Sequence, residues 1–248
     1  MNFVECPNIP NKKVSKVIVD YRISEESEKC LNTIGIECIK TKKCNSVYDE
    51  ISGHTDIQLI HLGENELIVE KSMYNEYSEI FKNIDVNLIK GDTILKDKYP
   101  LDIAYNGCII GNKFIHNLKY TDEVLLNKIE QKGFRLIDIN QGYSKCSISV
   151  VNGNNIITSD RKIEKELSKY LNVLYIENED NIKLGKMQGF IGGATGLISQ
   201  DVWCINGDIN RLKNCNKILD FLNLNNIKVM CLNDSEVIDI GSILPIIY

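Results

Sequence analysis

The sequence lacks the features that mark several large classes of protein. Its longest weakly polar stretch, residues 189–198, is far shorter than the about 18 apolar residues of a membrane-spanning helix. The first ten residues have neither the basic region nor the apolar run of a signal peptide. Basic residues are not in excess, because 29 Lys and Arg stand against 34 Asp and Glu. Nucleic-acid-binding surfaces are usually basic, so we expect no membrane and no nucleic-acid partner.

Paired cysteines and nucleotide-binding motifs are also missing. The nine cysteines are an odd number and none of them forms a Cys-x-x-Cys pair, a pattern that favours reduced cytoplasmic thiols over a disulfide framework or a zinc site. The chain contains neither Gly-x-Gly-x-x-Gly nor Gly-x-x-x-x-Gly-Lys-Ser/Thr. We therefore expect a cytoplasmic protein in which most cysteines are packing residues and one is chemically active.

What the sequence does contain is a repeat. Its 248 residues fall into units of about 50, each with a short strand, a Gly/Asn turn, a second strand, an amphipathic helix and a third strand. The clearest copy spans residues 102–139, with a helix predicted over 121–132. Gly133 follows that helix, where glycine commonly ends helices because it adopts a positive φ without penalty.

The other units follow the same order from His54, from Cys146 and from Gly193. A fifth unit is split between the two ends of the chain. Its first strand is predicted at residues 237–245, and its second strand, helix and third strand at residues 14–39. The sequence thus predicts an α/β (α+β) fold: a five-bladed α/β propeller of ββαβ repeats, formed by one domain, residues 1–248, whose ends share a blade. An open sheet of Rossmann type is the alternative. The tight turn between the first two strands of each unit indicates a hairpin instead.

Residues at the start of each first strand should face a common channel. Those positions carry His54, Asn106, Cys146, the Gly192–Gly193 pair and the segment beginning at Asp239. A thiolate that attacks an electron-poor carbon, with an imidazole that moves protons, is a common catalytic pair. Asp56 would share a strand face with His54. We interpret His61 and His116, which lie inside strand patterns, as structural.

The residues from His54 to Cys146 resemble the guanidino-group-modifying superfamily, which has the pentein fold. The resemblance rests on His54-Thr-Asp56, Leu62-Gly-Glu-Asn-Glu-Leu-Ile-Val69, Asn106-Gly-Cys-Ile-Ile-Gly and Gly142-Tyr-Ser-Lys-Cys146. The superfamily includes dimethylarginine dimethylaminohydrolase, arginine deiminase, agmatine deiminase and amidinotransferases. Its cysteine lies near the C-terminus, whereas more than a third of this chain follows Cys146, so the resemblance implies a circular permutation.

The resemblance also implies roles for particular residues. Cys146 would attack a guanidino or amidine carbon to form a covalent thiouronium-type intermediate, and His54 would protonate the leaving amine and then activate water. Asp239 would hold the imidazole in place of the superfamily's Glu. The substrate-binding positions would be Asp56, Asn106, Gly192 and Gly193, the two glycines standing where acidic ligands are usual and leaving room for a bulkier group. The implied partner is a small cationic guanidino or amidine compound, with no metal and no organic cofactor.

Two other functions remain open at this point. The missing acidic pair and the shorter Asp239 also fit a binding or scaffold protein that uses the same fold without catalysis. An ordinary α/β hydrolase is a further alternative, but the chain has no Gly-x-Ser-x-Gly element.

Overall fold

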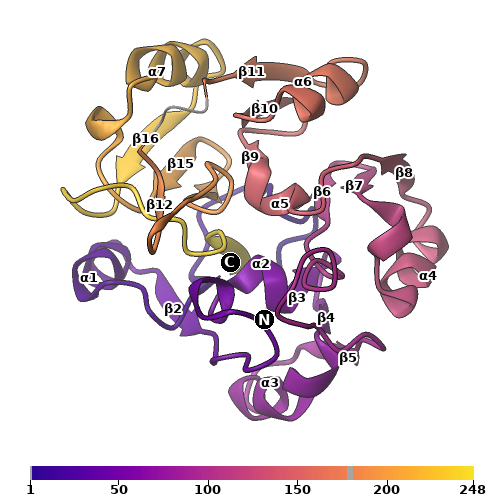
Figure 1. Ribbon diagram of the computed structural model, residues 1–248. Coiled ribbons are helices and arrows are strands. Elements are labelled where there is room, and N and C mark those ends of the chain that lie inside the picture. The colour runs from indigo at the N-terminus through magenta and orange to yellow at the C-terminus, as the bar shows by residue number, and fades with distance from the viewer. Residues whose placement is uncertain (1, 178–180) are drawn as a thin grey trace.

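The computed structural model describes residues 2–177 and 181–248. Within these residues the chain forms five three-stranded sheets, in each of which the first two strands are antiparallel and the second and third are parallel. Figure 1 shows these sheets around a common centre, with the longer helices on the outside. The predicted α/β class is confirmed.

Four of the sheets follow the chain in order, each with one helix between its second and third strands. They comprise β3 (Leu59–His61), β4 (Glu66–Val69), α3 (Tyr74–Ile80) and β5 (Asn87–Lys90); β6 (Cys108–Ile110), β7 (Lys113–His116), α4 (Glu123–Gln131) and β8 (Arg135–Asp138); β9 (Ser149–Val150), β10 (Asn155–Thr158), α6 (Arg161–Leu167) and β11 (Asn172–Tyr175); and β14 (Thr195–Ser199), β15 (Val202–Ile205), α7 (Cys215–Leu224) and β16 (Lys228–Cys231).

The remaining three-stranded sheet joins the two ends of the chain. Strand β17 (Leu244–Ile247) pairs antiparallel with β1 (Lys16–Val19), which pairs parallel with β2 (Glu37–Lys40) across helix α1 (Glu25–Thr33). Smaller elements connect the sheets, namely the hairpin of β12 (Lys183–Leu184) and β13 (Met187–Gln188), the helical turns α2 (Thr55–Gln58) and α5 (Ser144–Ser147), and a 3₁₀ turn at Asp49–Ile51. Three further 3₁₀ turns lie between the second strand of a sheet and the helix that follows it, at Lys71–Met73, Leu118–Tyr120 and Ile209–Arg211.

Local sequence signals explain the longer helices. The side chain of Asp122 accepts a hydrogen bond from the backbone N–H of Leu125, which satisfies one of the free donors at the start of α4. Leu125 and Ile129, four residues apart, are both buried on the inner face of the helix. Gly133 follows with φ +73°, as expected of a residue that ends a helix.

The predicted first strands were wrong at the positions nearest the centre. Residues 55–58 form helix α2 rather than the start of a strand, and Cys146 lies inside helix α5. Residues 102–105 and 237–242 are not strands either. A short apolar run cannot be distinguished by pattern from a buried helical turn, and here the backbone bonds to other segments, as Asp56 N–H does to Gly241 O at 3.1 Å.

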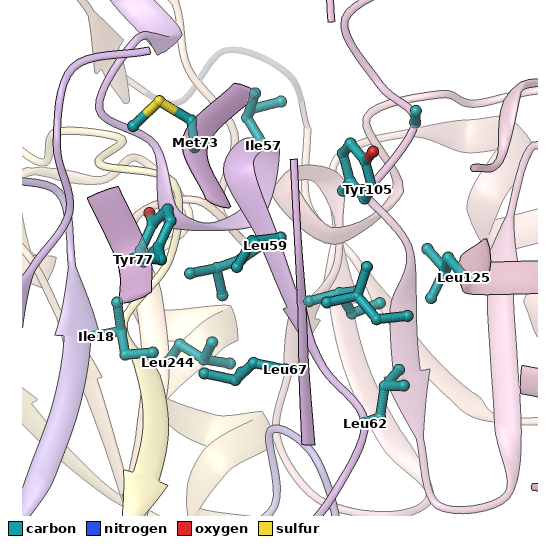
Figure 2. Close-up of a cluster of buried hydrophobic side chains, with 14 of the residues drawn as sticks. Ile18, Ile57, Leu59, Leu62, Leu67, Met73, Tyr77, Tyr105, Leu125 and Leu244 are labelled. Atoms are coloured by element: carbon teal, nitrogen blue, oxygen red, sulfur yellow. The ribbon is translucent and has the colours of Figure 1, made fainter. Parts of the chain in front are cut away.

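One of the two large hydrophobic clusters of the described residues packs around β3 and β4. Figure 2 shows Leu59 and Leu67 beside Tyr77 of α3, Ile18 of β1 and Leu244 of β17, all members of this cluster. The cluster therefore joins the chain-closing sheet to its neighbour. Among the described residues, no helix has the length and apolar character needed to cross a bilayer.

Replacing Leu67 by alanine should lower the free energy of unfolding by about 2–5 kcal/mol, because the fully buried side chain leaves a cavity. Leu224→Ala is the matched control, since Leu224 is 82% exposed, and it should change stability by no more than about 0.5 kcal/mol. Urea unfolding followed by circular dichroism measures both values. Equal losses in the two variants would contradict this account of the core.

Candidate functional site

Cys146 lies in α5 with its sulfur between two polar side chains. Its thiol donates to Asp56 Oδ1 at 3.2 Å, and Asn106 Nδ2 donates to the sulfur at 3.2 Å. The residue is only 2% exposed. Three segments far apart in the sequence thus meet at this sulfur, as the repeat predicts for residues in equivalent positions.

Asn106 fixes the backbone around Cys146. Its Oδ1 accepts hydrogen bonds from the backbone N–H groups of Lys145 at 2.9 Å and Cys146 at 3.3 Å. Its Nδ2 also donates to the backbone carbonyl of Asp56 at 2.9 Å. Because both ends of the amide are bonded to protein atoms, Asn106 is placed to hold the sulfur and the carboxylate in position.

The carboxylate of Asp56 is bonded at both oxygens. Oδ1 accepts from the Cys146 thiol, and Oδ2 accepts from the Ser242 hydroxyl at 2.7 Å. Asp56 lies in the helical turn α2 rather than on a strand, so the predicted strand face is not what brings it beside His54. The carboxylate nevertheless reaches the site, since His54, Asp56 and Cys146 each place a ligand atom within 4.8 Å of the others.

His54 and Asp239 form a second, looser pair. The distance between His54 Nδ1 and Asp239 Oδ1 is 3.8 Å, which is an ion-pair distance but too long for a hydrogen bond. Both ring nitrogens of His54 are buried without a hydrogen-bond partner. Asp239 is held by backbone N–H groups, with Phe190 donating to Oδ2 at 2.9 Å and Gly241 to Oδ1 at 3.0 Å. The imidazole is therefore free to bond a molecule that enters the site.

Burial and nearby carboxylates keep Cys146 in its thiol form. Burial is the main cause that raises the pKa of Cys146 well above its ordinary value, and the charges of Asp56 and Asp239 raise it further. The hydrogen bond from Asn106 acts in the opposite direction. Burial likewise raises the pKa of Asp239, while the His54 charge lowers it. A thiol in this setting needs an incoming positive charge to become a thiolate.

The loop before α5 is tied to its neighbours. His116 Nε2 lies 3.1 Å from Gly142 O, and the Tyr143 hydroxyl donates to Asp102 Oδ2 at 2.5 Å. The ring of Tyr143 also packs on that of Phe190, with centroids 5.9 Å apart.

Burial lowers the pKa of both His61 and His116 to about 4, so each is neutral near pH 7, as their structural interpretation requires.

The expectation that Gly192 and Gly193 leave room for a bulkier group was wrong. A Cβ atom at Gly192 would overlap the backbone carbonyl oxygens of residues 145, 146 and 148. A Cβ atom at Gly193 would overlap the carboxylate of Asp239. Both glycines are needed for close packing of backbone around the site, and no acidic side chain fits there without rearrangement.

Lys145 and Ser242, which were not predicted from the sequence as site residues, belong to the same cluster. The ammonium group of Lys145 donates to Ser242 Oγ at 2.8 Å, and Ser242 donates to Asp56. Lys145 precedes Cys146 in the sequence, and that adjacency was the one available signal. Ser242 carries no recognisable motif, because only the folded chain brings it to Asp56.

The site also contains a set of atoms that suits a metal ion. One imidazole nitrogen, one carboxylate oxygen and one sulfur come from His54, Asp56 and Cys146, and in the described part of the chain this is the group of such residues that lies close enough to share an ion. These are ligand types that zinc accepts. A thiol, an imidazole and a carboxylate are also the residue types that nucleophilic catalysis commonly uses.

The Gly193→Ala substitution should disrupt the site, because the new methyl group overlaps Asp239. We expect a loss of about 1–3 kcal/mol in the free energy of unfolding, as for other overpacked positions. Gly153→Ala is the matched control, since a Cβ there meets nothing within 4 Å. Thermal unfolding of both variants tests the prediction, and an unchanged melting temperature for Gly193→Ala would refute it.

Comparison with solved structures shows which proteins share this fold. The chain is similar to an inosamine-phosphate amidinotransferase from Streptomyces griseus, with 11% identity, a TM-score of 0.57 and 97% of each chain covered. It is also similar to an agmatine deiminase from C. jejuni, with 12% identity, a TM-score of 0.55 and coverage of 92% of this chain and 91% of that one.

A third similar structure is a dimethylarginine dimethylaminohydrolase from Pseudomonas aeruginosa in complex with citrulline. The identity is 8%, the TM-score 0.54, and 88% of this chain and 92% of that chain are covered. All three are pentein proteins, so the predicted resemblance is confirmed for the fold.

Among curated proteins, no sequence matches. A family profile does match residues 18–244, and the chain therefore belongs to the family described as a family of unknown function, DUF6873.

Proposed function

We propose that the protein is an enzyme that uses Cys146 to attack the carbon of a guanidino or amidine group. The observation that carries the proposal is the meeting of a thiol, a carboxylate and an imidazole within 4.8 Å of one another in a buried site. The fold is shared with amidinotransferase and deiminase structures, which supports the same class of chemistry. We further propose that the sheets form one closed, five-bladed ring, circularly permuted relative to those proteins.

The charge of the substrate would prepare the nucleophile. A planar guanidinium or amidinium group pairs well with a carboxylate, and Asp56 is the carboxylate beside the sulfur. The cation would offset the burial and the negative charges that raise the pKa of the Cys146 thiol. The thiol would then lose its proton only when substrate is bound, and the proton would pass to the His54 imidazole.

The bond changes follow from this arrangement. The thiolate of Cys146 would form a carbon–sulfur bond to the central carbon, giving a tetrahedral intermediate. The carbon–nitrogen bond to the leaving group would break as the imidazolium of His54 returns its proton to that nitrogen. A thiouronium-type intermediate would remain on the sulfur. His54 would then deprotonate a water molecule or an acceptor amine, whose attack breaks the carbon–sulfur bond and restores the thiol.

A second function is favoured by the buried, protonated nucleophile. A thiol that is 2% exposed and has a raised pKa would also suit a protein that binds a cationic compound without reacting with it. In that case Asp56 would still pair with the cation, and Cys146 would serve only as a hydrogen-bond donor. The two functions differ in whether a covalent bond forms.

Cys146→Ser should abolish turnover of guanidino compounds and covalent labelling by 2-chloroacetamidine, because the hydroxyl is a much weaker nucleophile. Cys30→Ser is the control, since Cys30 is half-buried and its sulfur faces the backbone of Cys231. Product analysis for ureido compounds and released amines measures turnover, and intact-protein mass spectrometry measures the adduct. Absence of both product and adduct in the wild-type protein, with retained ligand binding, would favour the binding function.

A further inference from the structure

Three aromatic rings form a row beside the candidate site. The ring of Tyr99 lies against that of Tyr143, with centroids 5.6 Å apart, and the ring of Tyr143 lies 5.9 Å from that of Phe190. The backbone N–H of Phe190 donates to Asp239 Oδ2 at 2.9 Å, so the row begins at the pair formed by Asp239 and His54. We call Tyr99, Tyr143 and Phe190 the aromatic row.

The aromatic row runs from the buried site to the surface. Cys146, which follows Tyr143 by three positions, is only 2% exposed. Tyr143 and Phe190 are partly exposed, and Tyr99 is 51% exposed. A compound whose reacting group lies at the Cys146 sulfur would therefore have these rings beside the part that extends toward solvent.

Tyr143 is held firmly in the middle of the aromatic row. Its hydroxyl donates to Asp102 Oδ2 at 2.5 Å and lies 3.3 Å from the hydroxyl of Tyr48. Its backbone N–H donates to the side-chain oxygen of Gln141 at 3.1 Å. Because the polar groups of Tyr143 are bonded to the protein, its ring faces are what remains for a ligand to contact. A ring that is already fixed loses little freedom when a ligand packs on it.

Tyr48 lies between this part of the aromatic row and the sulfur. Burial raises the pKa of its hydroxyl, whereas the hydrogen bond with Tyr143 lowers it. The charges of Asp102 and of Cys146, when ionised, raise that pKa further. The Cys146 sulfur is therefore close enough to Tyr48 for its charge to act there.

Tyr99 lies on glycine backbone at the outer end of the aromatic row. A Cβ atom at Gly142 would lie 2.9 Å from Tyr99 Cε2 and 2.3 Å from Ile103 Cδ1, so glycine leaves the space that the ring needs. The segment 94–101 carries three large apolar side chains that are about half exposed, namely Ile94 at 53%, Tyr99 at 51% and Leu101 at 47%. Exposed apolar side chains that gather in this way commonly mark a binding surface.

These contacts favour a flat apolar group over a charged one. Aromatic ring faces carry partial negative charge, and the Asp102 carboxylate lies next to the Tyr143 hydroxyl, so an anionic group is disfavoured. Asp102 is itself 0% exposed, so a cationic group that lies on the rings does not reach it. An aromatic group gains from packing on Tyr143 and Tyr99 and needs no further polar partner.

We infer that Tyr143 and Tyr99 bind a flat apolar substituent of the compound that reacts at Cys146. The inference rests on the proposed function for the reacting group and adds the class of substrate, which is an aryl or arylalkyl guanidine or amidine. A substituent that ends in a carboxylate is excluded on this account. Tyr99 contacts the substituent and not the reacting carbon, so it determines specificity.

The test compares two alkylating probes that differ in their substituent. N-Benzyl-2-chloroacetamidine and N-methyl-2-chloroacetamidine carry the same reactive carbon, at which the Cys146 sulfur displaces chloride and forms a carbon–sulfur bond. Intact-protein mass spectrometry gives the second-order rate constant for each adduct. The ratio of the two constants, divided by the same ratio for glutathione, cancels the reactivity of the thiol. The wild type should prefer the benzyl probe by about tenfold.

Two variants at Tyr99 separate the ring from the rest of the side chain. Tyr99→Ala removes the ring and should lower the preference about fivefold. Tyr99→Phe keeps the ring and should keep the preference. Tyr170→Ala is the matched control, because the ring of Tyr170 packs on the guanidinium of Arg135, 4.5 Å from its centroid, and lies outside the aromatic row. This control should match the wild type.

A wild-type preference of about one would overturn the inference, whether or not the variants fold. An unchanged preference in folded Tyr99→Ala would also overturn it. The same holds for a stronger preference for N-(3-aminopropyl)-2-chloroacetamidine, which would indicate a cationic substituent.

Failure of the proposed function looks different, because no probe would then modify Cys146 in the wild type. In that case calorimetric titration with benzamidine and acetamidine tests the aromatic row without a covalent step. Tighter binding of benzamidine, weakened in Tyr99→Ala and kept in Tyr99→Phe, would support the inference. Equal affinities, or no binding of either compound, would overturn it.

Discussion

The carboxylate of Asp56 is the group on which the rest of the site depends. One of its oxygens accepts a hydrogen bond from the Cys146 thiol, and the other accepts one from the Ser242 hydroxyl. The backbone carbonyl of Asp56 accepts a hydrogen bond from the side chain of Asn106. Its backbone N–H bonds to Gly241 O. Three separate segments of the chain are therefore fixed to one residue. The bonds from the Cys146 thiol and the Ser242 hydroxyl reach the carboxylate, and a hydrogen bond to a charged acceptor is stronger than a neutral one.

Close backbone packing makes this arrangement possible. Gly192 and Gly193 bring their segment against α5 and Asp239 at distances that no side chain allows. Gly193 also bonds to Cys146 O at 2.9 Å through its backbone N–H. The glycines thus contribute close backbone contacts to the site, and Lys145 and the two aspartates are charged side chains around them.

Much of the fold could be predicted from the sequence, because each repeat unit carries its own signals. The helix predicted over residues 121–132 is observed as α4 at Glu123–Gln131, and the pairing of residues 244–247 with 16–19 follows from the split unit. The predictions failed next to the centre, where residues 55–58 and Cys146 lie in helical turns. There the backbone conformation is decided by hydrogen bonds to distant segments, which a local pattern of apolar residues does not reveal.

The sequence by itself determined the repeat, the class of fold and the candidate residues His54, Asp56 and Cys146, since these depend on periodicity and on residue type. The tertiary structure alone decided that Asn106 holds the sulfur, that the two glycines are packed against carbonyl and carboxylate oxygens, and that Lys145 bonds to Ser242. The physical reason is that hydrogen bonds and steric contacts act over a few ångströms in space. Lys145 and Ser242 are 97 positions apart in the sequence, and only folding brings them within that range.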